Sequence, residues 1–144
     1  MTMSMDFSYA LTPLLAWLVA GTLKFIINSV KSGQWAFGLI GYGGLPSTHS
    51  AIVSSTTALI ALREGIDHSA FAVAVTFAFV VMLDASSLRR QVGKHAEAIN
   101  RLTGKANRDE TMHLRERIGH TKLEIAAGIM VGVGVAVLVH TWKG

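Results

Sequence analysis

The chain has 144 residues, of which 51% are hydrophobic, with a formal net charge of +4 at pH 7 and no cysteine. This length suits one domain, which we place at residues 1–144. The absence of cysteine excludes a disulfide framework, a thiolate metal site and a thiol nucleophile. Such an apolar chain leaves too little polar sequence to cover a soluble helical bundle, so an integral membrane protein is favoured.

The apolar residues gather in four blocks along the chain, at residues 7–27, 51–62, 70–83 and 123–139. A helix needs about 20 residues, within a range of roughly 17 to 25, to cross the hydrocarbon of a bilayer. The first and fourth blocks reach that length, whereas the second and third reach it only when extended to residues 47–63 and 69–87. We therefore predict an all-α membrane bundle with about four transmembrane helices. Residues 1–6 contain no Lys or Arg, so we do not expect a cleavable signal peptide.

Two longer connections remain between these spans. Four spans in series place both chain ends on one side of the membrane and residues 28–46 and 86–121 on the other side, here called the site face. Residues 84–104 have the periodicity of an amphipathic helix that either continues from the third span or leans on it, and that ends at Gly104. Residues 112–120 are expected to approach the fourth span as a short helix or loop.

Basic residues are concentrated on the site face. Of the 13 Lys and Arg residues, only Arg63 and Lys143 fall on the opposite side. The positive-inside tendency then predicts a multi-pass protein of the cell inner (cytoplasmic) membrane with its site face in the cytoplasm. Because basic residues beside a bilayer meet anionic lipid head groups, nucleic acid is not an expected partner.

Polar residues that could form a site converge on the same face, because the four spans alternate in direction. They are Lys24 at the end of the first span, Ser47, Thr48 and His49 at the start of the second, Asp84, Arg89 and Arg90 at the end of the third, and Arg115, His120 and Glu124 around the start of the fourth. Polar groups at the depth of a membrane indicate function by default.

The stretch "GGLPSTHSA" at residues 43–51 has the composition of an anion-binding helix start. The first turn of a helix offers free N–H groups and the positive end of the dipole. Gly43 and Gly44 permit close backbone approach, and Ser47 or Thr48 can cap the helix or donate to an anionic oxygen. The alternative is that this stretch is a helix cap and nothing more.

The remaining residues fit phosphate chemistry. Arg89 and Arg90 can grip phosphate oxygens, although arginines at this depth also serve as lipid anchors. Two histidines near an anion can divide the work, one attacking phosphorus and the other protonating the leaving oxygen. Glu124 follows His120 by one helical turn and could orient its ring.

These motifs resemble those of a known family. "PSTHS" is similar to a motif of the type 2 phosphatidic acid phosphatases, which are relatives of the acid phosphatases and vanadium haloperoxidases. Together with "LVAGTLKFIINSVKSG", "LDASSLRRQVGKHAEAIN" and "LRERIGHTKLEIAAGIMVG", it most resembles the divergent bacterial branch of that superfamily. The resemblance implies that His120 is the nucleophile, that Glu124 orients it where Asp is usual, and that His49 is the general acid. It also implies that Ser47 and the backbone at Thr48 hold phosphate oxygens.

The chain departs from the family motifs at two places. Lys24 matches the first motif, but Lys31 and Ser32 stand where Arg and Pro are usual. The usual Arg of the third motif falls on Leu114, so either Arg115 takes that role or Arg89 and Arg90 supply the charge.

We therefore expect a membrane phosphatase that hydrolyses a lipid phosphate or diphosphate through a phospho-histidine. No metal or other cofactor is expected, because cations and helix starts supply the positive charge. The alternatives are a non-catalytic binder or transporter of a phosphorylated lipid, or a purely structural membrane subunit. The expected partners are a phosphorylated lipid, the bilayer and a second copy of the chain, because four spans make a smaller bundle than the six of the larger membrane members.

Overall fold

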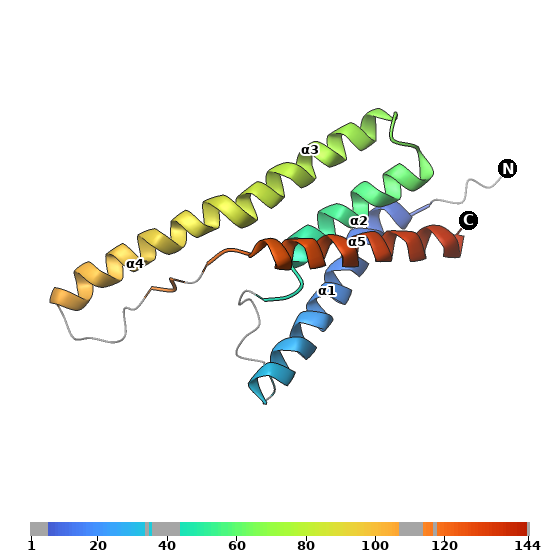
Figure 1. Ribbon diagram of the computed structural model, residues 1–144. Helices are drawn as coiled ribbons and strands as arrows, with labels where there is room; N and C mark the ends of the chain where they lie inside the picture. The colour runs from blue at the N-terminus through green and yellow to red at the C-terminus, as the bar shows by residue number, and fades with distance from the viewer. Residues whose placement is uncertain (1–5, 34, 36–43, 107–113, 117, 144) are drawn as a thin grey trace.

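The structure is a computed structural model that describes residues 6–33, 35, 44–106, 114–116 and 118–143. Within these ranges the chain is helical and has no strand (Figure 1). The elements are α1 (Ser8–Ser32), α2 (Thr48–Arg63), α3 (Ser69–Leu83), the π-helical turn η2 (Asp84–Leu88), α4 (Arg89–Ala106) and α5 (Lys122–Lys143). The all-α prediction is confirmed.

Three helices are long and apolar enough to cross a membrane, over Ser8–Ser32, Ser69–Thr103 and Lys122–Trp142. They correspond to the first, third and fourth predicted spans. The second, α2, has the predicted bounds almost to the residue, but its 16 residues extend only about 24 Å, against about 30 Å of hydrocarbon. It therefore falls short of the length of a span.

Helix α2 lies at the centre of the bundle, between α1, α3 and α5. Its contact with α5 depends on two glycines spaced one turn apart. A β-carbon on Gly128 would lie 2.4 Å from the carbonyl oxygen of Ser47, and one on Gly132 would lie 2.4 Å from that of Ala51. Only glycine lets the two helix backbones approach so closely, an arrangement typical of helix pairs in membranes.

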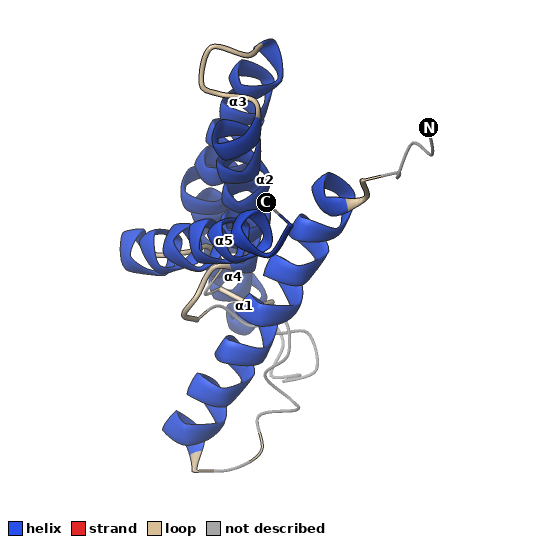
Figure 2. Cartoon of the chain, turned by 90° about the vertical axis from the view of Figure 1, so that its right-hand side faces the viewer, coloured by secondary structure: helices blue, strands red, loops and turns tan. Residues whose placement is uncertain are grey.

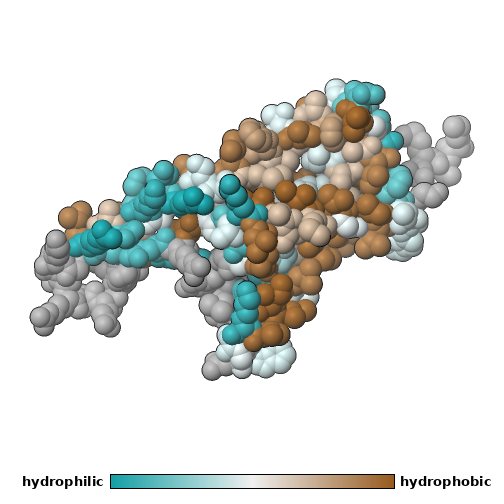
Figure 3. Space-filling model, viewed as in Figure 1, coloured by the Kyte–Doolittle hydropathy of each residue, from teal (hydrophilic) through white to brown (hydrophobic). Residues whose placement is uncertain are grey.

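The interior of the bundle is made of small side chains. Its core cluster consists of Ala16 and Ala20 from α1, Ala51 from α2 and Val135 from α5. In contrast, the outward faces of α1, α3 and α5 expose many large apolar residues. Figure 3 shows this apolar surface over the bundle and a hydrophilic surface along α4. This is the distribution of side chains that a bilayer requires, because lipid is the solvent of those outer faces.

Helices α3 and α4 form one long rod joined by η2, and this rod extends well beyond the rest of the bundle (Figure 1). Its helix from Ser69 to Thr103 has 35 residues, which corresponds to about 52 Å and exceeds the hydrocarbon thickness. The predicted amphipathic helix is thus confirmed as a continuation of the third span. The expected stop at Gly104 was wrong, because the helix continues to Ala106.

The start of α1 and the end of α5 lie at the same end of the bundle (Figure 1), and Figure 2 shows α1 crossing the others obliquely. Asp6 forms an ion pair with Arg63 at 2.6 Å, and the hydroxyl of Tyr9 donates a hydrogen bond to Glu64. These contacts hold the start of α1 against the connection between α2 and α3. The end of α1, the start of α2, the end of α3 and the start of α5 lie at the opposite end of the bundle. These helix ends bear the residues of the predicted site.

Candidate active site

Two histidines from separate helix starts face each other at the site end of the bundle. His49 is the second residue of α2, and His120 lies two residues before α5. Their ring centroids are 6.3 Å apart and the ring planes are inclined by 51°. Nδ1 of His49 is buried and has no hydrogen-bond partner among the described residues. A buried ring nitrogen without a partner costs free energy unless a ligand or water satisfies it.

The carboxylate of Glu124 both orients His120 and caps α5. Its Oε2 lies 3.3 Å from Nδ1 of His120 and accepts a 2.8 Å hydrogen bond from the N–H of Thr121. The N–H of Glu124 in turn donates to Oγ1 of Thr121 at 3.2 Å. These two reciprocal bonds form a capping box. Because Glu124 engages Nδ1, the other ring nitrogen of His120, Nε2, is left to carry the lone pair.

Burial lowers the pKa of the His120 imidazole from its ordinary value of 6.5. The hydrogen bond and the charge of Glu124 act in the opposite sense, whereas the positive charges of Lys24 and Arg89 add to the lowering. A neutral imidazole at pH 7 follows, and only the neutral ring can attack phosphorus.

The π-helical turn η2 holds the backbone of His120. In an α-helix the carbonyl oxygen of Ala85 would accept from the N–H of Arg89. The N–H of Arg89 instead donates to the carbonyl of Asp84, and the carbonyl of Ala85 accepts from the N–H of His120 at 3.0 Å. Gly119, with φ 114°, lies against this turn at the same place. The widened turn thus provides an acceptor for the site, a use in keeping with the frequency of π-bulges at functional sites.

A buried amide ties the connecting segment, residues 114–116 and 118–121, to α4. Oδ1 of Asn100 accepts from the N–H of Leu114 at 2.8 Å, and Nδ2 donates to the carbonyl of Leu114 at 2.7 Å and to Oε1 of Glu116 at 3.0 Å. Two helical turns before Asn100 in α4, a β-carbon on Gly93 would lie 2.3 Å from the carbonyl oxygen of Glu116. Sequence reasoning missed both residues. Their signal was the small or polar stripe formed by Gly93, Ala96 and Asn100 in an otherwise charged and apolar helix.

Ser47 lies at the start of α2 as a helix cap. It is fully buried, and its Oγ accepts from the N–H and the hydroxyl of Ser50 at 3.4 and 3.0 Å. Its own N–H donates to the carbonyl of Glu124 at 2.9 Å, which joins the starts of α2 and α5. Thr48 is the first residue of α2, where N–H groups have no partner within the helix.

The glycines before this cap were expected to permit close approach. Gly44 has φ 145°, and a β-carbon there would lie 3.1 Å from Oδ1 of Asn28 on α1. A side chain at Gly44 would therefore press against the side chain of Asn28 while holding a strained backbone. Gly43 lies outside the described residues.

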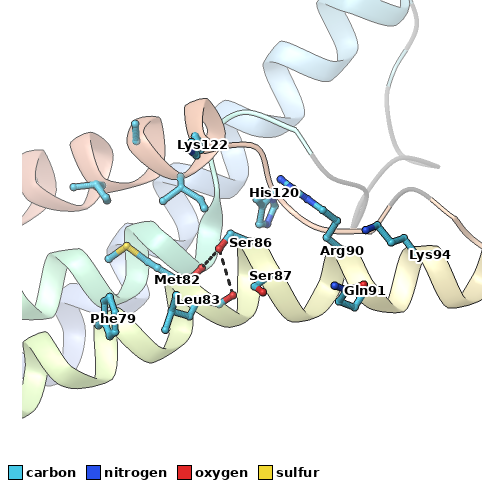
Figure 4. A pocket seen from close by; sticks show the side chains of 13 residues that line it. Phe79, Met82, Leu83, Ser86, Ser87, Arg90, Gln91, Lys94, His120 and Lys122 are labelled. Atoms are coloured by element: carbon cyan, nitrogen blue, oxygen red, sulfur yellow. Dashed lines mark hydrogen bonds between the residues drawn. The ribbon is translucent and has the colours of Figure 1, made fainter.

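The structure also places the predicted charged residues. Lys24, Asp84 and Arg89 lie close enough to His49 to act on it electrostatically, and Asp84 pairs with Nε of Arg89 at 3.3 Å. Arg90 points toward His120 (Figure 4). Arg115 has an exposed side chain on the connecting segment.

A cavity of about 610 Å³ opens beside His120. It lies between the α3–η2–α4 rod and the start of α5, and its lining includes Arg90, Lys94, His120 and Lys122 (Figure 4). The described part of the chain contains no group of three or more His, Asp or Glu side chains that could hold a metal ion. The polar groups of this site are thus imidazoles, a carboxylate and cations, a combination suited to a phosphate group.

Comparison with known proteins agrees with this chemistry. The sequence profile of the Divergent PAP2 family matches residues 6–135. The chain belongs to the divergent PAP2 family. It is also 33% identical, over 138 residues, to a Bacillus subtilis (strain 168) protein described as "Uncharacterized membrane protein YuiD". The match covers 85% of this chain and 87% of YuiD. No solved structure matches the chain.

Membership of this family confirms the resemblance inferred from the four motifs. With three helices able to span a bilayer and a membrane protein as relative, this divergent PAP2 protein is a membrane protein related to phosphatases.

Proposed function

We propose that this divergent PAP2 protein is a membrane phosphatase that hydrolyses a lipid phosphate or diphosphate. The observation that supports this most strongly is the 6.3 Å separation of the His49 and His120 rings, with Glu124 bonded to one of them. Two imidazoles at that separation can act on one phosphoryl group from two sides, and apo distances of this kind tighten when substrate binds.

In the first half of the reaction, Nε2 of His120 attacks phosphorus. The new N–P bond forms as the bond from phosphorus to the leaving oxygen breaks, and His49 donates a proton to that oxygen. Glu124 stabilises the positive charge that develops on the ring of His120. Lys24 and Arg89 lie near both rings and would offset the negative charge on the phosphoryl oxygens.

In the second half, water attacks the phosphorus of the phospho-histidine. His49, now neutral, accepts a proton from this water, the N–P bond breaks, and phosphate leaves. Both rings return to their starting protonation states. In this proposal the N–H groups at Thr48 and the guanidinium of Arg90 bind phosphate oxygens, whereas Ser47 and Gly44 shape the start of α2 that presents them.

The second candidate is a binder or transporter that holds a phosphorylated lipid at the same site without turnover. It is favoured by the two departures from the family motifs, since Lys31 and Leu114 stand where arginines are usual. We place the site face in the cytoplasm, since the basic residues are concentrated there.

Release of inorganic phosphate tests the proposal against this candidate. The detergent-purified protein is given a panel of lipid phosphates and diphosphates, beside His49→Ala and His120→Ala. We expect release by the wild type that is lost in both variants. Lipid-phosphate binding with no release from any member of the panel would favour the binder.

A further inference from the structure

Helix α4 presents three different faces. Gly93, Ala96 and Asn100 are buried, and Gly93 and Asn100 meet the connecting segment. Arg90 and Lys94 line the cavity of the candidate site (Figure 4). The third face is apolar and exposed.

This third face, here called the seam, has the residue spacing of a coiled coil. Its members recur at intervals of four, three, four and three positions and are Leu88, Val92, His95, Ile99 and Leu102. All five side chains are exposed, the four apolar ones by 46% to 71%. Alternating intervals of three and four residues place side chains at the a and d positions of a heptad, the pattern of helices that pair with one another.

The residue types at the two heptad positions match a parallel pair of helices. The a positions hold the β-branched residues Val92 and Ile99, and the outer d positions hold Leu88 and Leu102. β-Branched residues at a with leucine at d favour two parallel strands. His95 is the one polar member, at the central d position, and a single polar residue in a seam sets the register at some cost in stability.

We propose that the seam pairs with the seam of a second copy of this chain, as a parallel two-stranded coiled coil. Helices α3 and α4 form one rod (Figure 1), so α4 projects from the bilayer that α3 crosses. Two copies in one membrane share their orientation, so their α4 helices run parallel and each seam residue meets its counterpart. Confinement to one membrane raises the effective concentration of the two helices, which helps a seam of only two heptads to pair. The pairing does not depend on catalytic turnover.

The charges of α4 are placed so that this basic helix can meet a copy of itself. Across residues 91–103, the charged side chains of Lys94, Glu97 and Arg101 occupy heptad positions c and f, away from the seam. Like charges at e and g would oppose a homodimer. Over the same described stretch these flanking positions hold only uncharged residues, namely Gln91, Ala96, Ala98 and Thr103.

A bilayer surface fits the seam less well than a second helix. The π-helical turn carries α3 into α4 without a break (Figure 1). A helix lies in the plane of the interface, so α4 would have to turn away from the span that leads into it. The narrow a and d spacing is also that of a helix partner rather than of the broader apolar face that a flat surface covers.

Cysteine cross-linking in membranes tests the pairing, because the chain has no cysteine of its own. Paired helices with axes about 8–10 Å apart bring Cα atoms within the roughly 7 Å that a disulfide spans only on their facing sides. Val92→Cys, Ile99→Cys and Leu102→Cys should therefore give about tenfold more disulfide-linked dimer than the control variants Glu97→Cys and Arg101→Cys. Equal cross-linking at all five positions would overturn the seam.

Labelling with a water-soluble maleimide separates the other outcomes. Seam cysteines that neither cross-link nor react with the maleimide lie against the bilayer. Seam cysteines that react with the maleimide but do not cross-link have no partner. Either result overturns the pairing.

His95→Leu provides a complementary variant that strengthens the seam instead of probing it. Leucine is the favoured residue at d, so sedimentation in detergent should show a dimer dissociation constant about tenfold lower than that of the wild type. Arg101→Leu adds the same side chain to the charged face and should leave the constant within about twofold. An unchanged constant in His95→Leu, or an equal decrease in both variants, would contradict the coiled coil.

Discussion

His120 and Glu124 are joined by a contact of 3.3 Å between Nδ1 and Oε2, and the same Oε2 caps the helix that begins just beyond them. The orientation of the imidazole and the start of α5 therefore depend on one carboxylate. A longer acid than the aspartate usual in the family can serve both purposes, because glutamate at the third helical position is the residue that completes a capping box.

Replacement of Glu124 separates its two roles. Glu124→Gln retains the cap, since glutamine also completes a capping box, but removes the charge that stabilises the His120 imidazolium. We expect kcat to fall by about one order of magnitude or more, with unchanged thermal unfolding. Glu124→Ala should lose the cap as well and cost about 1 kcal/mol of stability. Phosphate release and thermal unfolding in detergent measure the two effects. Equal stability of both variants would contradict the capping role.

The acid limb of the pH–rate profile reports the protonation of His120. Because burial lowers its pKa below 6.5, kcat/KM should fall only as the pH drops below that value, where the imidazole takes up a proton. Glu124→Gln removes a charge that raises this pKa, so the limb should move to lower pH. Lys24→Gln removes a charge that lowers it, so the limb should move to higher pH. If the acid limbs of Glu124→Gln and Lys24→Gln moved in the same direction, His120 would be excluded as the titrating group.

Much of the fold could be predicted because a membrane helix can be recognised from the length of its run of apolar residues. The starts of α1, α2 and α5 followed from blocks of apolar residues and from the cap at Ser47, whereas α1 and α5 continue four or five residues beyond the ends of their blocks. The second block was already too short for a span without extension, and the structure adds that the small residues of α2 are buried against α5 rather than exposed to lipid. The end of α4 was wrong because a single Gly weakens a helix without ending it.

The candidate site was predicted as a set of residues, but not in its supporting geometry. The pairing of His49 with His120 followed from alternating spans, since both lie at helix starts on one face. The π-turn has no signature in "DASSL", because its wider turn is selected by tertiary contact with the N–H of His120. The clamp by Asn100 likewise depends on a connecting segment whose path no periodicity describes.

Asn100 should act on the site at a distance, through the position of the connecting segment. Asn100→Ala leaves the N–H and carbonyl of Leu114 without these partners, so we expect a loss of about 1–3 kcal/mol in stability. Activity should fall because the connecting segment carries His120. Thr103→Ala on the same helix is the control, since that hydroxyl bonds only within α4 among the contacts seen here. Hydrogen exchange at Leu114 measures the release directly, and protection equal to the wild type would refute the clamp.

The glycines of α5 offer a matched comparison of packing. Gly128→Ala and Gly132→Ala would each place a β-carbon 2.4 Å from a carbonyl oxygen of α2, and overpacking of this kind costs about 1–3 kcal/mol. Gly134 lies in the same helix with nothing within 4 Å of its β-carbon position. Gly134→Ala should therefore leave the unfolding temperature unchanged or raise it slightly. Similar effects of all three substitutions would contradict the close approach of α2 and α5.

The central claim is that His120 is a nucleophile, and the most direct test is to trap the phosphorylated ring. A radiolabelled lipid phosphate is mixed with the protein, the reaction is stopped with alkali within its first turnover, and the label is mapped by mass spectrometry. We predict an alkali-stable, acid-labile phosphate on His120, absent from His120→Ala and longer-lived in His49→Ala, where water lacks its base. Phosphate release by the wild type without label on His120, or persisting in His120→Ala, would contradict the account.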